Sequence, residues 1–152
     1  MDAILGALDR AIRASLVGIV GVMVAVVFAQ VVARYGLNAS IGWADEIARL
    51  AFVATVFLGI AVAVRARAHI GITLLAEALP PLPRALLRRA VLFGCAVLSA
   101  LVAYEAAAIA LEQWDERMIS VELSAAWFLV PVVAGMGVSA LHFLAAAVGD
   151  ER

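Results

Sequence analysis

The sequence predicts an all-α integral membrane protein with four transmembrane helices. Of its 152 residues, 66% are apolar, a share well above that of soluble domains. A helix needs about 20 apolar residues to cross the hydrocarbon core. Four stretches meet this length, and together they leave no room for a soluble domain. We therefore expect a single membrane domain over residues 1–152, with spans near 14–35, 43–64, 85–111 and 123–148.

The first span is expected to begin at Ala14, after a segment that lies at the membrane surface. Residues 1–13 place apolar and charged side chains on opposite helical faces, a pattern typical of an interfacial helix. Gln30 is the one strongly polar residue before Arg34, and Gly36 suits the end of the helix. The apolar run is longer than that of a cleaved signal peptide, so an uncleaved helix is predicted.

The second span opens with ionisable residues and closes with more of them. Asp45, Glu46 and Arg49 lie within two turns of the helix start. Beyond Val64, apolar residues recur at helical spacing up to the prolines that begin at Pro80, which predicts a short amphipathic interfacial helix between the second and third spans.

The third and fourth spans contain few polar residues. The third begins after Pro83, which is tolerated in a first helical turn, and it carries Glu105 inside its apolar run. The fourth contains Pro131 and His142. Because Pro131 falls inside the expected helix, we predict a kink there.

The arginines predict the orientation, since the sequence contains no lysine and cytoplasmic loops are rich in basic residues. With the N-terminus inside, eight arginines fall on the cytoplasmic side and three on the outer side. Both termini are therefore predicted to be cytoplasmic (N-in/C-in). The cytoplasmic set comprises Arg10, Arg13, Arg65, Arg67, Arg84, Arg88, Arg89 and Arg152. The outer set comprises Arg34, Arg49 and Arg117.

No pattern typical of catalysis is present. Cys95 is the single cysteine, and neither His69 nor His142 belongs to a cluster with metal-ligand spacing. Phosphate-binding loops and nucleophile motifs are missing as well. The sequence predicts neither an enzyme nor a bound cofactor, metal or nucleic acid.

Arg49 and Glu105 are the polar residues of greatest interest, because charges at membrane depth are costly. Three environments suit Arg49: a headgroup position beside Asp45 and Glu46, a polar contact that Trp43, Glu46 and Arg49 form with another helix or subunit, and an ion site. Glu105 lies at similar depth, so it is compatible with an Arg49 pair, with a wet groove, or with proton coupling.

The order of features from Gly42 to Pro83 resembles the small membrane subunit, or Q subunit, of tripartite ATP-independent periplasmic (TRAP) transporters. The resemblance rests on the W-x-x-E-x-x-R opening at Trp43, an L-G pair near the helix end, the R-x-R-x-H-I-x-I step from Arg65, and an L-P turn beyond it. It extends more weakly over the other three spans.

The resemblance implies a non-catalytic subunit that holds a large transport subunit in the bacterial inner membrane. It also implies sodium-coupled uptake of an organic acid that a periplasmic solute-binding protein delivers. Trp43, Glu46 and Arg49 match the most characteristic positions. His69 matches the exit step, and we place Arg65, Arg67, His69, Arg84, Arg88 and Arg89 at the cytoplasmic interface, in contact with lipid. The alternative is an autonomous, homodimeric, proton-coupled transporter that uses Glu105.

Overall fold

The computed structural model describes residues 2–65 and 80–148, which form four long α-helices and one short 3₁₀ helix. The long helices are α1 (Asp2–Gly36), α2 (Ala44–Arg65), α4 (Pro81–Glu112) and α5 (Val130–Val148), and η1 (Ala125–Phe128) precedes α5. No β-strand occurs in these two ranges. All four long helices are long and apolar enough to cross a membrane, and each overlaps one predicted span. The expected interfacial helix falls on residues outside the described ranges.

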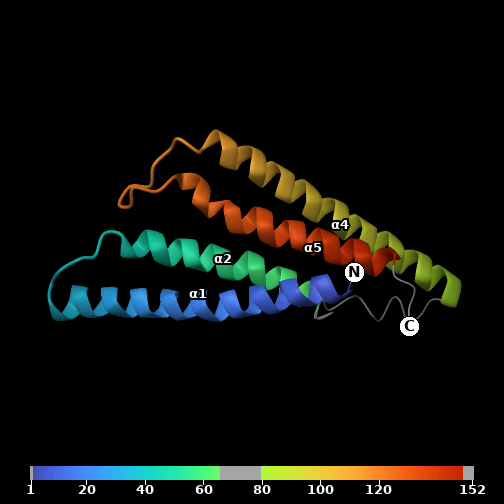
Figure 1. The fold of residues 1–152 in the computed structure, drawn as a ribbon, viewed down its shortest axis with the longest axis horizontal. Coiled ribbons are helices and arrows are strands. Elements are labelled where there is room, and N and C mark those ends of the chain that lie inside the picture. The colour runs from blue at the N-terminus through green and yellow to red at the C-terminus, as the bar shows by residue number, and fades with distance from the viewer. Residues whose placement is uncertain (1, 66–79, 149–152) are drawn as a thin grey trace.

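The helices lie side by side in the order α1, α2, α5, α4, as Figure 1 shows. Helix α1 packs against α2, α2 against α5, and α5 against α4. Within the described ranges, α1 touches neither α4 nor α5, and α2 does not touch α4. The arrangement is therefore an open row, in which α1 and α4 form the edges.

Helix α1 contacts α2 through a narrow stripe. All residues from Arg10 to Gly36 are exposed except those of the stripe. The stripe residues are buried or half-buried and are spaced alternately four and three apart: Ile12, Leu16, Ile19, Met23, Val26, Gln30 and Ala33. This is the spacing of a coiled-coil seam. The other faces of α1 carry exposed valines and phenylalanine, which suit a lipid or protein environment.

Two expectations about helix boundaries are wrong. Helix α1 continues without a break from Asp2 through the segment that we expected to turn at the membrane surface near Arg13. The segment is rich in alanine and contains no proline, so nothing in it ends a helix. Pro131 does not lie inside a kinked helix. It is the second residue of α5, where an N–H group would have no intrahelical partner, and η1 forms the preceding turn.

Helices α2 and α5 approach each other most closely at Gly135. A Cβ atom added to Gly135 would lie 2.5 Å from the carbonyl carbon of Phe57 and 3.1 Å from the amide nitrogen of Leu58. One turn later, Ser139 is fully buried and its hydroxyl donates to the Gly135 carbonyl oxygen at 2.8 Å. Small residues four apart therefore let the two backbones meet.

The two ends of the row differ. We call the end with residues 37–43 and 113–124 the loop end, and the opposite end, where α1 and α4 begin and α2 and α5 finish, the terminal end (Figure 1). Arg10, Arg13 and the arginines of the first turns of α4 belong to the terminal end. Three other arginines belong to the loop end: Arg34, Arg49 and Arg117.

Candidate functional site

The candidate site lies at the loop end, where α2 begins. The chain turns at Gly42 and Trp43, and the Trp43 carbonyl oxygen accepts the Ile47 amide at 3.1 Å to start the helix. Asp45 and Glu46 occupy the first turn, where the free N–H groups and the helix dipole favour negative charge. Two adjacent carboxylates thus point from one helix start to different partners.

Asp45 binds the neighbouring helix α1. Its Oδ1 atom accepts a hydrogen bond from the side-chain amide of Gln30 at 2.9 Å. The sequence places both residues in the same layer, because Gln30 is near the end of one span and Asp45 near the start of the next. The bond therefore connects the last turns of α1 to the first turn of α2.

Glu46 binds the loop between α4 and α5. Its Oε1 atom accepts the Ile119 amide at 2.8 Å and the Ser120 amide at 3.1 Å, and its Oε2 atom accepts the Ser120 amide at 3.0 Å. Consecutive main-chain N–H groups converging on one carboxylate form a charge-assisted contact. Glu46 therefore joins segments more than 70 positions apart in the sequence.

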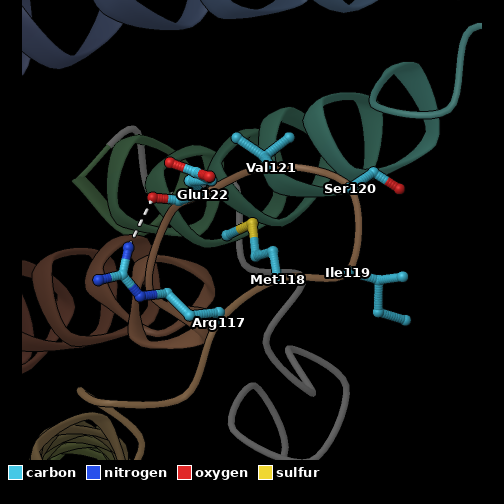
Figure 2. Close-up of a pocket in the computed structure, with 6 residues that line it drawn as sticks. All are labelled: Arg117, Met118, Ile119, Ser120, Val121 and Glu122. Atoms are coloured by element: carbon cyan, nitrogen blue, oxygen red, sulfur yellow. Dashed lines mark hydrogen bonds between the residues drawn. The ribbon is translucent and has the colours of Figure 1, made fainter.

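The loop that Glu46 binds, residues 113–124, has internal order of its own. Arg117 and Ser124 form an isolated antiparallel bridge, and the Met118 amide donates to the Leu123 carbonyl oxygen at 2.9 Å. The Arg117 guanidinium donates to the Glu122 carbonyl oxygen at 3.1 Å, as Figure 2 shows. Met118 is buried, so the loop has a small core.

The apolar side chain at the tip of the loop is open to its surroundings. Ile119 is 99% exposed, although its own amide is fixed by Glu46. In Figure 2 the Ile119 and Ser120 side chains point away from the loop, while Met118 points into it. The tip thus has a defined backbone and a free apolar side chain.

Trp43, Arg49 and Glu105 face outward. Trp43 is half exposed. Arg49 is exposed on a stripe of α2 that continues through Phe52 and Val56. Glu105 is exposed on α4. Within the described ranges neither Arg49 nor Glu105 forms a hydrogen bond or ion pair, and their helices do not pack together. The structure therefore does not bring this pair into contact.

The predicted basic group belongs to the terminal end. Arg84, Arg88 and Arg89 lie on the first turns of α4, with Arg88 half-buried and the other two exposed. Arg65 is the last residue of α2. The Arg65 side chain, Arg67 and His69 lie outside what the structure describes.

Sequence reasoning missed the partner of Glu46. The donors are main-chain N–H groups of Ile119 and Ser120, which every residue type except proline provides, so side-chain identity gives no signal. Reasoning from helix depth suggested Glu105 as a partner for Arg49, because depth says nothing about which helices are neighbours. Among the described residues, no three His, Cys, Asp or Glu side chains gather as metal ligands would.

Comparisons with known proteins agree with the resemblance that the α2 region suggested. Residues 23–152 match the DctQ component of tripartite ATP-independent periplasmic transporters. A protein of Haemophilus influenzae, assigned by name to the small permease proteins of TRAP transporters, is 35% identical over 81 residues. That alignment covers 53% of this chain and 50% of the relative, so the match spans about half the length of each. The chain, with four helices able to span a membrane, therefore belongs to the DctQ family, the small membrane components of TRAP transporters.

Proposed function

We propose that this chain is a scaffold subunit that binds and orients a large transport subunit in the bacterial inner membrane. The observation that carries the proposal is the open row of helices, in which α1 and α4 each pack against one neighbour. A transport pathway in a helical protein is formed between several helices near the midplane. An open row that exposes broad apolar faces is better suited to lie against a larger protein than to enclose a substrate.

Arg49 and Glu105 support a protein partner for these faces. A charge within the hydrocarbon region costs about 2.5–3.5 kcal/mol on insertion scales, unless it finds a partner or reaches the headgroups. Both side chains are exposed, on helices that are long and apolar enough to cross a membrane. Neither side chain has a partner in the described ranges. We infer that the polar layer of Trp43, Arg49 and Glu105 contacts polar groups of the large subunit.

Family membership supports a further proposal about transport. We propose that the complex couples sodium entry to uptake of an organic acid, which a soluble periplasmic binding protein delivers at the loop end. The arginines support this orientation, because Arg10, Arg13, Arg84, Arg88 and Arg89 belong to the terminal end, and the positive-inside rule favours the cytoplasm for the end richer in basic residues. The chain's part is structural, so it is a transporter component rather than an enzyme.

Reconstitution tests the proposal against an autonomous transporter. Alone in liposomes, the chain is expected to transport nothing. With its large subunit, a sodium gradient and a loaded binding protein, uptake is expected to appear. Proton- or sodium-driven flux by the isolated chain, lost in Glu105→Gln at unchanged folding, would instead establish the autonomous alternative.

Copurification tests the polar layer. Arg49→Ala is expected to reduce the amount of large subunit that copurifies with the chain, because a charge in the partner loses its counterpart. Arg34→Ala is the matched control, since Arg34 is also an exposed arginine at the loop end but lies on α1, at its last turn. Equal recovery of the large subunit with both variants would show that Arg49 serves only as a headgroup contact.

A further inference from the structure

The described helices can be grouped in two pairs that are joined along one seam, where α2 packs against α5 about as extensively as it packs against α1. We call α1 and α2 the first pair, and α5 with α4 and η1 the second pair. Among the described residues, contacts between the pairs are those of α2 with α5 and η1 and those of the loop tip with Glu46 and the turn before α2. The relative position of the pairs therefore depends on this one seam.

The seam has a rigid point at Gly135. There the main chains of α5 and α2 meet without an intervening side chain, against Phe57 and Leu58. Contacts between main-chain atoms cannot relax by rotamer changes, so relative motion of the pairs is easiest as a rotation about this point. Such a rotation separates the loop tip from the start of α2 and moves the terminal end in the opposite sense, if nothing else holds the loop end.

Glu46 supplies the second attachment, at the loop end. Its carboxylate belongs to the first pair, and the Ile119 and Ser120 amides belong to the second. The loop tip also lies against the turn before α2, since a Cβ atom added to Gly42 would lie 3.8 Å from the Ser120 hydroxyl. Asp45, the adjacent carboxylate, bonds to Gln30 and stays within the first pair.

We propose that Glu46 is a latch that fixes the second helix pair to the first at the loop end, with the Gly135 contact as the pivot. With the latch closed, the two pairs hold one relative orientation and the loop tip keeps its place beside α2. With the latch open, the loop ends of the two pairs separate while the seam at Gly135 persists.

Distance measurements by pulsed EPR test the latch. Nitroxide labels on Leu37→Cys and Trp114→Cys report across the loop end, in a Cys95→Ala background. Glu46→Ala is expected to lengthen and broaden this distance distribution. Asp45→Ala removes an equivalent charge from the same helix turn but only a bond within the first pair, so it is expected to change the distribution less than Glu46→Ala does.

A second label pair locates the motion. Labels on Ala11→Cys and Leu82→Cys span the terminal end, and their distance is expected to shorten in Glu46→Ala while the loop-end distance lengthens, because a rotation about Gly135 moves the two ends in opposite senses. If Glu46→Ala is recovered in low yield, Glu46→Gln serves in its place, because it keeps the shape and one acceptor oxygen but loses the charge. Glu46→Gln is expected to give a distribution intermediate between parent and Glu46→Ala.

A disulfide provides the rescue. Gly42→Cys with Ser120→Cys is expected to form a cross-link across the latch, since the two positions are adjacent. In a Glu46→Ala background this cross-link is expected to restore the narrow loop-end distribution. An unchanged loop-end distribution in folded Glu46→Ala or Glu46→Gln would overturn the proposal. An equal change in Asp45→Ala would overturn it as well, because Asp45 does not cross the seam.

Discussion

Gly135→Ala should weaken the seam between α2 and α5. The added Cβ atom would lie 2.5 Å from the carbonyl carbon of Phe57. Carbon atoms pack at about 3.5–4.0 Å, so the helices must separate locally by about 1 Å, which forfeits up to half of the dispersion energy at the contact. Overpacking of this kind costs about 1–3 kcal/mol. For a chain of this size, that corresponds to a fall in melting temperature of roughly 3–9 °C.

Gly137→Ala is the matched control. Gly137 is on the same helix two residues later, and a Cβ atom there meets nothing within 4 Å. The exchange of glycine for alanine improves helix propensity by up to about 1 kcal/mol, so the melting temperature should hold or rise. Thermal unfolding in detergent, followed by circular dichroism and by size-exclusion recovery after heating, measures both variants.

The contact with Phe57 also provides an internal check. Because the crowded atoms belong to the Phe57 main chain, Phe57→Ala should not rescue Gly135→Ala. Equal melting temperatures for Gly135→Ala and Gly137→Ala would refute the close approach. Rescue by Phe57→Ala would show that the crowding involves a side chain instead.

Two further predictions concern the loop end. Gln30→Ala and Asp45→Ala should each lower the melting temperature slightly, because each removes the same hydrogen bond. A double-mutant cycle should therefore give a coupling free energy of about 0.5–1.5 kcal/mol. Additive effects of the two substitutions would show that the bond contributes nothing to stability. In a Cys95→Ala background, an impermeant maleimide added to intact cells should label Leu37→Cys but not Leu82→Cys, and the reverse result would overturn the predicted orientation.

Hydropathy revealed the four helices because the bilayer imposes a minimum apolar length on every span. It could not reveal their order in space, since lipid and a neighbouring helix are equally apolar environments. Pro131 shows a second limit, because an apolar run does not reveal where a 3₁₀ turn gives way to an α-helix. The two carboxylates at the start of α2 can be read from the sequence. Gln30, which bonds to Asp45, is also placed at the same membrane depth as Asp45 by its position near the end of α1.

The partner of Glu46 was beyond sequence reasoning, for a physical reason. A carboxylate that accepts main-chain amides needs a loop of suitable shape, not a residue of complementary charge. The loop tip carries Ile119 and Ser120, which give no indication of anion binding. Charge matching therefore directed attention to Arg49 and Glu105, two side chains that the structure keeps apart.

The narrow stripe that joins α1 to α2 has a consequence for biosynthesis. In the described part of the chain, α1 contacts only the helix that follows it, so this pair can assemble in the membrane before the later helices are made. Assembly of α4 with α5 is equally local. Interactions between sequence neighbours close small loops and form quickly. The contacts of α5 with α4 and α2 form last, because α5 is the last of the described helices. A ribosome-bound chain truncated after α2 should already hold its first two helices together.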